Sequence, residues 1–362
     1  MRTLLDKIIH FIAKAILPLL NLICFPFLIL LSITQYRICL VDTSRIGHFF
    51  CDLLRFYSNN QEKNLIVIFP KNICNSELLK IYKSYGIKFY KNKTLYRIIN
   101  LFRLSNTFIK NLHNESAPVS LFNLVNFPTK LHTNDNELVL INQLRERYRP
   151  DYSELSKKIG IDEKTIQIHF RSPSFNPDTE NIHYARSSPE DLFYEICQIA
   201  LNQKNKIMRV GGKHYSLRKI NNPLYIDYPN STFKNDKNDI LLILFCNKFI
   251  GDSTGLSSSI NLCRVKCFFF NYLPLSYLPK YETSTVIYKK TDQIFAEPRF
   301  YEDNNKCYDN FKNLSIEDIK IPLITFLQNK SMNKYIDSKK TNFYKKRKNG
   351  FGFLAKGAII NG

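Results

Sequence analysis

The sequence contains no tryptophan, only three methionines, and no CxxC, HExxH or HxxxH pattern. The short motifs that usually bind zinc or carry out thiol redox chemistry are therefore absent. Eleven glycines and fifteen prolines among 362 residues exclude a collagen-like or linker-dominated chain. There is no internal repeat of fixed period. What remains is a chain long enough for two globular domains.

Nine cysteines are present, an odd number, and several lie inside apolar runs such as residues 241–246. An unpaired, apolar placement is typical of buried thiols in a reducing compartment rather than of a disulfide framework. We expect no metal and no cofactor.

The charge is strongly positive, with 52 Lys+Arg against 31 Asp+Glu and a formal net charge of +21. Such a surface suits nucleic acid, an anionic membrane surface or a negatively charged substrate such as a nucleotide sugar. A genome rich in A and T also favours Lys, Asn and Ile without any functional reason. No recognised nucleic-acid-binding motif occurs, so we expect no nucleic acid partner.

The amino-terminal segment, residues 1–36, contains 19 uncharged residues between Ala15 and Ile33, preceded by an excess of basic residues. That length is near the lower limit for spanning a bilayer. Pro18 and Pro26 would kink a spanning helix, and no signal-peptide cleavage pattern follows. We expect a membrane-associating segment that lies in the interface, with a spanning anchor and a buried core helix as alternatives.

Residues 37–150 alternate between short apolar strands and amphipathic helices, which predicts a parallel sheet in an α/β domain. Pro150 is the predicted boundary of this domain. The expected strands cover residues 37–42, 65–69 and 87–90, and the expected helices cover residues 49–57, 76–85, 95–112 and 137–149.

The alternation restarts in residues 151–330 and predicts a second α/β domain, followed by a basic tail at 331–362. Ser188 is the expected N-cap of a helix that runs to about Gln203, because Pro and two acidic residues follow it. Strands are expected at 165–170, 206–210, 225–227, 248–251 and 266–271, and further helices at 236–245 and after 255.

Candidate site residues follow the predicted strands of the second domain, at the sheet edge where α/β proteins bind ligands. His169 and Arg171 end one strand, and an arginine there can grip a diphosphate with two hydrogen bonds. Arg209 and Gly211 end the next, where glycine allows close approach of the backbone.

A third candidate is the turn Asp252-Ser-Thr-Gly255, which leads from a strand into a helix. Ser253, Thr254 and Gly255 would bind phosphate there through hydroxyls and helix N–H groups. Asp236 and Asp239 lie on one helix face, Asp236 as a cap and Asp239 as an acceptor from a nucleobase or ribose.

In the first domain, Arg45-Ile-Gly-His48 follows a strand. His48 is the candidate general base for an acceptor hydroxyl, or a ligand of the donor phosphate. Asp52, one turn later, is the second acid–base candidate.

The order of these motifs resembles a family of bacterial glycosyltransferases found with surface-polysaccharide genes. The matching stretches are IHFRSPSF, HYARSS, IMRVGG, YIDYPNS, DKNDILL, CNKFIGDSTGL and NYLPLSYLPK, between Gln167 and about Glu282, with RIGH near Arg45. HFR and DSTG are more distantly similar to fucosyltransferases that use GDP-fucose.

The resemblance implies a GT-B-like fold with two Rossmann-like domains facing a cleft, and hexosyl or deoxyhexosyl transfer without a metal. It implies Arg171 on the donor diphosphate, Ser253 and Thr254 on the phosphates, and Asp239 near the base or ribose. The implied partners are a nucleotide-diphosphate sugar, a glycan or lipid-linked acceptor and a membrane surface, at the cytoplasmic face of the bacterial inner membrane.

Two other functions stay open on the sequence alone. A catalytically inactive relative that serves as a membrane scaffold would tolerate replacement of Arg171. A basic nucleic-acid-binding protein would bind generic DNA or RNA in a salt-dependent manner.

Overall fold

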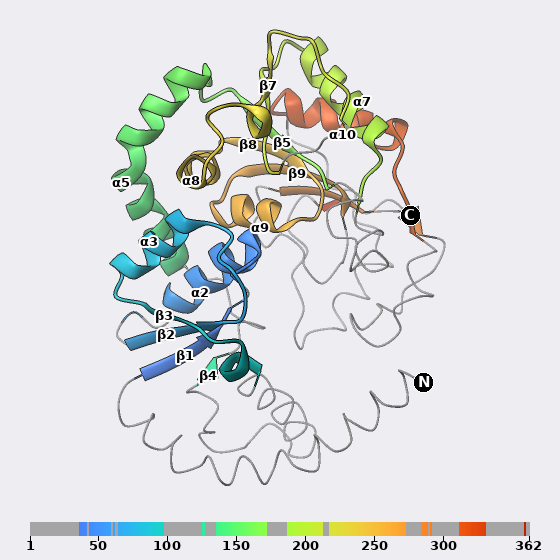
Figure 1. Ribbon diagram of the computed structural model, residues 1–362. Helices are drawn as coiled ribbons and strands as arrows, with labels where there is room; N and C mark the ends of the chain where they lie inside the picture. The colour runs from blue at the N-terminus through green and yellow to red at the C-terminus, as the bar shows by residue number, and fades with distance from the viewer. Residues whose placement is uncertain are drawn as a thin grey trace. The chain divides into compact units, whose positions relative to one another are not determined.

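The computed structural model describes two compact units, residues 1–137 and 138–362 (Figure 1). The described residues are 36–41, 43–58, 61, 64–97, 125–126, 135–171, 187–212, 217–272, 284–288, 290–291, 311–330 and 358–359.

Unit 1 is built on a four-stranded parallel sheet with the strand order β3-β2-β1-β4. The central strand β2 is the run Asn-Leu-Ile-Val-Ile-Phe, whose apolar side chains are mostly buried. This run is typical of a parallel strand covered on both faces. The strands are β1 (Tyr36–Leu40), β2 (Asn64–Phe69), β3 (Lys88–Lys91) and β4 (Val125–Asn126).

The helical turns of unit 1 contact one another through aromatic side chains. A π-helical turn η1 (His48–Asp52) leads into α2 (Leu53–Ser58), and α3 (Ser76–Ser84) follows β2. The side chain of Asn75 caps α3 by accepting a hydrogen bond from the Leu78 N–H at 2.9 Å. The Tyr82 hydroxyl donates to the Phe50 carbonyl at 2.8 Å, which fixes α3 against η1.

Unit 2 contains a seven-stranded sheet in the order β13-β10-β9-β8-β5-β6-β7, and every neighbouring pair in it is parallel. Its strands are β5 (Ile166–His169), β6 (Ile207–Arg209), β7 (Tyr225–Asp227), β8 (Lys248–Gly251), β9 (Lys266–Tyr272), β10 (Ser284–Tyr288) and β13 (Ala358–Ile359). A separate antiparallel pair joins β11 (Lys290–Thr291) to β12 (Phe311–Lys312).

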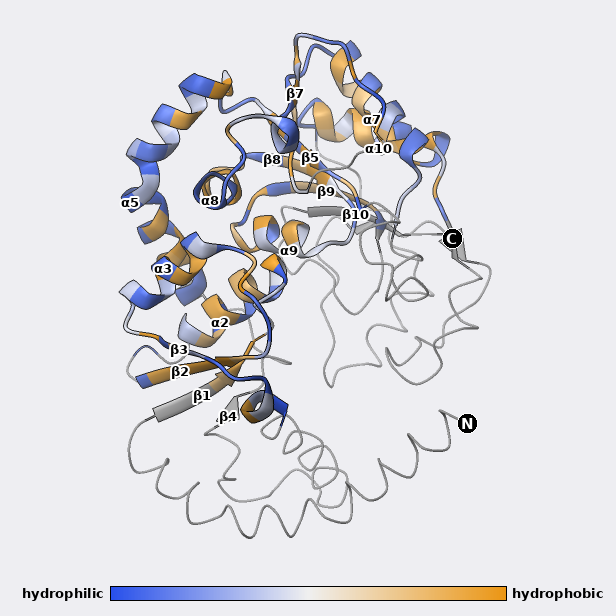
Figure 2. Cartoon of the chain, in the orientation of Figure 1, coloured by the Kyte–Doolittle hydropathy of each residue, from blue (hydrophilic) through white to orange (hydrophobic). Residues whose placement is uncertain are grey.

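Helices of unit 2 cover both faces of this sheet. One face packs α7 (Glu190–Asn202) and α10 (Ile316–Leu327) into a single core with Ile166 and Ile168 of β5. On the other face, Gln167 of β5 donates to the Leu242 carbonyl of α8 (Asp236–Leu244) at 2.8 Å. Successive side chains of β5 therefore pack against helices on opposite faces of the sheet, because side chains alternate between the two faces along a strand. In Figure 2, α7 and α10 each carry a hydrophobic and a hydrophilic side.

Three further helices complete the described part of unit 2. They are α5 (Asp135–Ile159), whose first residues belong to unit 1, α8 (Asp236–Leu244) and α9 (Gly255–Leu262). A short 3₁₀ turn, η5 (Tyr228–Asn230), follows β7.

Most predicted elements match the structure, and the α/β fold class is confirmed. The GT-B arrangement of the two domains stays a prediction. Of the expected segments 1–36 and 331–362, the structure describes Tyr36, which begins β1, and Ala358–Ile359, which form β13 within the expected basic tail. The rest of these segments, and most of the helix expected at 95–112, lie outside the described residues. Within those residues, no helix is both long and apolar enough to cross a bilayer.

Two local predictions are corrected. Pro150 lies inside α5 rather than in a linker, and the compact units divide after Glu137. The helix continues because one proline removes a single N–H donor, a cost that the packing of a long helix can offset.

Ser188 does not cap α7, which has Pro189 at its N-cap position with no side-chain cap. The Ser188 hydroxyl bonds Asp252 instead.

Arg145 of α5 holds the carboxyl-terminal ends of two other helices. Its Nε donates to the Leu244 carbonyl at 2.7 Å and its Nη2 to the Cys263 carbonyl at 2.9 Å. Cationic donors at helix carboxyl ends bond carbonyls that have no intrahelical partner and interact favourably with the helix dipole.

We expect Arg145→Ala to lower the free energy of unfolding by about 2 kcal/mol, measured by urea titration. Arg149→Ala, on the exposed side of the same helix, should change the free energy of unfolding by less than about 0.5 kcal/mol. Equal losses in the two variants would show that the hydrogen bonds of Arg145 to the Leu244 and Cys263 carbonyls do not stabilise the fold.

Lys248, at the start of β8, is a half-buried cation. Its Nζ donates to the Leu327 carbonyl at 2.9 Å and lies 4.8 Å from the centre of the Phe326 ring. Burial, and to a smaller extent repulsion from Lys266, lowers the pKa of Lys248 to about 8. In the unfolded chain the amine has its ordinary pKa near 10.5. Between these values the unfolded state binds more protons, so the contribution of Lys248 to stability rises with pH.

We therefore expect the stability of the wild type, relative to Lys248→Met, to increase by about 1 kcal/mol between roughly pH 7.5 and 9.5, after allowance for partial exposure. Urea titrations at several pH values measure this difference. Lys157→Met, at an exposed position of α5, corrects for the change in overall charge. Its difference in stability from the wild type should not change with pH. A pH-independent difference between wild type and Lys248→Met would contradict the lowered pKa.

Candidate functional site

The strand order of unit 2 reverses between β5 and β8. From β5 the chain proceeds through β6 and β7 toward one edge of the sheet, and from β8 through β9 and β10 toward the other. In open parallel α/β sheets, ligands bind beyond the carboxyl ends of the strands at the point where the strand order reverses. The predicted motifs at His169–Arg171 and Asp252–Gly255 follow these two strands. Both motifs therefore lie at the place where the strand order reverses, which we call the switch point.

His169 ends β5 and packs directly against the loop that follows β6. Its Nδ1 lies 3.0 Å from the Val210 carbonyl oxygen, so Nδ1 carries the proton and donates to it. Gly211 has φ +103°, and a Cβ there would lie 2.5 Å from His169 Nδ1. A glycine is therefore required for this contact. The structure thus places His169 and Gly211, two predicted site residues, in direct contact.

Arg171 is held by a buried carboxylate that the sequence analysis had given no role. Its backbone N–H donates to Asp252 Oδ2 at 2.7 Å, and the Ser188 hydroxyl donates to the same oxygen at 3.2 Å. Asp252 is fully buried, and Arg171 is 9% exposed. Asp252 therefore links the loop after β5, the loop after β8 and the start of α7 in one network.

The same network reaches the end of β9 through Asn271. Its Nδ2 donates to the Ser188 hydroxyl at 3.3 Å, and its Oδ1 accepts from the Leu314 N–H at 2.7 Å. Asn271 is buried and has φ +47°, a conformation that asparagine tolerates better than most residues. The carboxyl ends of β5, β8 and β9 are fixed together by buried hydrogen bonds, which gives this edge a defined shape.

The turn after β8 forms the amino-terminal end of α9. Thr254 is the N-cap, and its Oγ1 accepts from the Ser257 N–H at 3.1 Å. Gly255 opens the helix, and Ser253 before it is buried. First-turn N–H groups have no intrahelical acceptor, and with the helix dipole they favour an anion. The structure thus sets Ser253, Thr254 and Gly255 at a helix start, as predicted.

Arg209 has a different environment from the one expected. Its side chain is 2% exposed, and its Nε and Nη2 lie 2.7 and 2.6 Å from Asp227 Oδ1 at the end of the neighbouring strand β7. Asp227 compensates the arginine charge, so Arg209 adds little net positive charge for a diphosphate. It serves instead to orient Asp227, whose other oxygen accepts from Asn230 Nδ2 at 2.8 Å.

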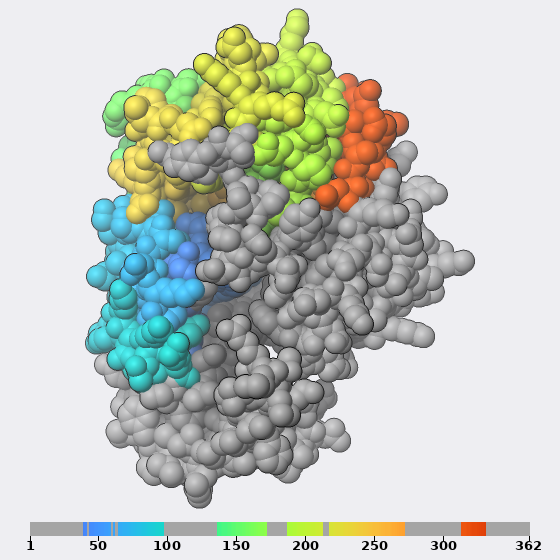
Figure 3. All heavy atoms as spheres, turned by 45° about the vertical axis from the view of Figure 1, so that its right-hand side comes forward, coloured from blue at the N-terminus to red at the C-terminus, as the bar shows by residue number. Residues whose placement is uncertain are grey.

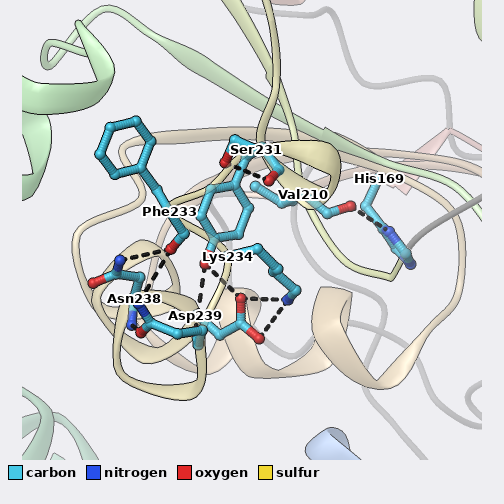
Figure 4. A network of polar contacts seen from close by, with 9 residues as sticks. His169, Val210, Ser231, Phe233, Lys234, Asn238 and Asp239 are labelled. Carbon is cyan, nitrogen blue, oxygen red and sulfur yellow. Dashed lines mark hydrogen bonds and ion pairs between the residues drawn. The ribbon is translucent and has the colours of Figure 1, made fainter.

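Asp239 is also engaged by side chains of its own unit (Figure 4). Both its oxygens lie 2.5 Å from Lys234 Nζ, and the Tyr228 hydroxyl donates to Oδ1 at 2.8 Å. Burial raises the pKa of Asp239 although Lys234 opposes the shift. Burial, reinforced by Asp239, raises the pKa of Tyr228 as well. Asp236 does not cap α8, because the Asn235 side chain accepts from the Asn238 N–H at 2.9 Å and occupies the cap.

In unit 1, the strand order also reverses at β1, which is flanked by β2 and β4. The loop after β1 leads into η1, where His48 Nδ1 lies 2.7 Å from Asp52 Oδ2. The His48 side chain is 49% exposed and that of Asp52 18% exposed. π-helical turns are rare and frequent at functional sites. The two predicted acid–base candidates therefore form one hydrogen-bonded pair.

The described residues hold no cluster of three or more His, Cys, Asp or Glu side chains arranged to bind a metal. Burial raises the pKa of the Cys39, Cys197 and Cys246 thiols, which keeps them in the unreactive protonated form.

No protein-family model and no curated protein matches the chain. Among solved structures it is similar to a glycosyl transferase family 9 protein from Veillonella parvula, at 14% identity and a TM-score of 0.46, over 82% of this chain and 98% of that one. It is similar to E. coli ADP-heptose LPS heptosyltransferase II at 10% identity and a TM-score of 0.42, over 81% and 99%. E. coli heptosyltransferase WaaC, solved with ADP, matches at 10% identity and a TM-score of 0.40, over 82% and 100%.

Proposed function

We propose that the protein is a glycosyltransferase that moves a sugar from a nucleotide-diphosphate donor to a glycan or lipid-linked acceptor. The observation that carries the proposal is the switch point between β5 and β8. It brings the Arg171 segment and the start of α9 to one edge of a parallel sheet. A cation and a helix N-terminus together suit a diphosphate.

In the proposed reaction, the acceptor hydroxyl oxygen attacks the anomeric carbon of the donor sugar. The bond between that carbon and the β-phosphate oxygen breaks, and the nucleoside diphosphate leaves with the electron pair. Arg171 and the first turn of α9 stabilise the charge that develops on the leaving diphosphate. His48 takes the proton from the acceptor hydroxyl, while the hydrogen bond to Asp52 orients the imidazole.

The finer parts of the proposal concern the fold, the metal and the location. A GT-B arrangement would give the donor to unit 2 and the acceptor to unit 1. Positive charge from Arg171 would replace a divalent ion, so transfer of the hexose or deoxyhexose would be metal-independent. The amino-terminal apolar segment would keep the protein at the cytoplasmic face of a bacterial inner membrane, near a lipid-linked acceptor in surface-polysaccharide synthesis.

A thermal-shift screen with GDP, UDP, CDP and ADP tests the donor site. We expect one nucleotide to stabilise the protein by about 2.7 kcal/mol at roughly 100 times its dissociation constant. The shift should be the same with Mg²⁺ and with EDTA. It should disappear in Arg171→Ala and persist in Arg149→Ala, which removes an exposed arginine of α5.

Failure of all four nucleotides to shift the unfolding temperature would overturn the donor site. A shift that needs Mg²⁺ would overturn metal independence alone. A nucleotide-induced thermal shift that persists in Arg171→Ala would show that Arg171 does not bind the donor diphosphate.

A further inference from the structure

Unit 1 carries an exposed basic surface around the end of β3. Lys71, Lys91, Lys93 and Arg97 are exposed there. Among residues 64–97 the one acidic side chain, Glu77, is buried and lies 3.2 Å from Lys80. Within residues 64–97, all the exposed charged side chains are therefore positive.

The chain brings the ends of β2 and β3 together at this surface. Phe69 pairs with Lys91 in the parallel ladder, and the Asn92 N–H donates to the Phe69 carbonyl at 3.1 Å. Lys91 Nζ donates to Asn72 Oδ1 at 2.7 Å. The segment after β2, with Lys71, therefore lies beside the segment after β3. In Figure 3, the sky-blue and cyan atoms of residues 64–97 form a continuous part of one face.

Apolar side chains protrude from the same stretch. Tyr90 is 52% exposed and Leu95 is 39% exposed. The described residues contain two other large hydrophobic side chains that are exposed, Val139 and Ile321. We define the basic edge as Lys71, Tyr90, Lys91, Lys93, Leu95 and Arg97. A mixture of cations with exposed aromatic and aliphatic groups is typical of surfaces that lie on anionic lipid.

A purely structural explanation covers only part of this surface. Lysines on an outer strand discourage pairing with another sheet, and β3 is the outer strand of its described sheet. Lys71, Lys93 and Arg97 lie outside β3, however. Exposed Tyr90 and Leu95 would promote association rather than prevent it.

We propose that the basic edge docks unit 1 on an anionic lipid membrane, with the cations against the headgroups and Tyr90 and Leu95 at the interface. This inference deepens the proposed membrane location and rests on it, but it needs no transferase assay. It assigns the membrane contact to named residues of a folded surface, in addition to the amino-terminal apolar segment.

Flotation of the full chain with phosphatidylcholine vesicles, with and without phosphatidylglycerol, tests the surface. Each cation near an anionic membrane raises partitioning about five-fold. The variant Lys71→Gln/Lys93→Gln/Arg97→Gln should therefore partition on the order of 100-fold less onto phosphatidylglycerol vesicles. Its partitioning onto phosphatidylcholine alone should not change, because contact through uncharged residues does not depend on lipid charge.

The matched control Lys157→Gln/Lys164→Gln/Lys219→Gln removes three exposed lysines of unit 2 and should retain wild-type partitioning. Tyr90→Ser/Leu95→Ser should reduce the part of the binding that survives high salt. The triple variant of the basic edge should keep its thermal shift with nucleotide, so loss of docking is distinguishable from failure of the donor site.

Equal partitioning of the wild type and the basic-edge variant onto phosphatidylglycerol vesicles would overturn the inference. So would equal losses in the basic-edge variant and the control, because the effect would then reflect net charge alone. Binding of single-stranded DNA that the basic-edge variant loses, without vesicle binding by the wild type, would show that the surface serves nucleic acid instead.

Discussion

Asp252→Ala is expected to lose nucleotide binding and about 3 kcal/mol of folding stability. The carboxylate is fully buried and accepts hydrogen bonds from the Arg171 N–H and the Ser188 hydroxyl. Its removal leaves two buried donors unsatisfied, at about 1–3 kcal/mol each. The loop after β5 would also lose the contact that fixes the Arg171 backbone, so a diphosphate would meet a misplaced guanidinium. Urea titration measures the stability, and calorimetry with the nucleotide found in the screen measures the binding.

Two further variants distinguish a misplaced Arg171 from a loss of folding stability. Asp252→Asn keeps an oxygen that can accept from Arg171 but removes the charge, so its nucleotide affinity should lie between those of the wild type and Asp252→Ala. Asp191→Ala removes an exposed carboxylate that pairs with Arg218, and should cost less than about 0.5 kcal/mol. A folded Asp252→Ala protein with wild-type affinity for the nucleotide would show that Asp252 does not position Arg171.

Eight strands of the two sheets could be predicted from the sequence because each is a short apolar run between turn residues, whereas β4, β10 and β13 were not predicted. Residues 225–227 and 248–251 were predicted as strands with the bounds that β7 and β8 have in the structure. Local composition determines such elements almost alone. The positions of Arg171 and of the helix start at Gly255 follow from the same runs, since both come immediately after a strand.

The contacts between strands could not be predicted in this way. Asp252 bonds a residue 81 positions away, and nothing in either segment indicates that β5 and β8 are neighbours. Arg209 and Asp227 are opposite each other in the register of β6 and β7, which composition does not specify. The strong capping pattern at Ser188 was misleading because a local hydroxyl can serve a distant carboxylate instead.

His48→Ala is expected to reduce sugar transfer by about 10²–10⁴-fold, the usual contribution of a positioned general base. Asp52→Asn should cause a smaller loss, because it keeps the side-chain shape but weakens the hydrogen bond that orients His48 at 2.7 Å. Release of nucleoside diphosphate at saturating donor and acceptor measures the rate. Lys83→Ala, on the exposed side of α3, should retain the wild-type rate.

Nucleotide binding distinguishes this prediction from a general loss of structure. The proposed donor site belongs to unit 2, so His48→Ala and Asp52→Asn should keep the thermal shift with nucleotide while transfer falls. Loss of both properties would mean that the substitutions disturb the fold rather than the proton transfer. A wild-type rate in His48→Ala would assign the base to another residue, and the pair in η1 would then be no more than a link between two successive turns of one helix.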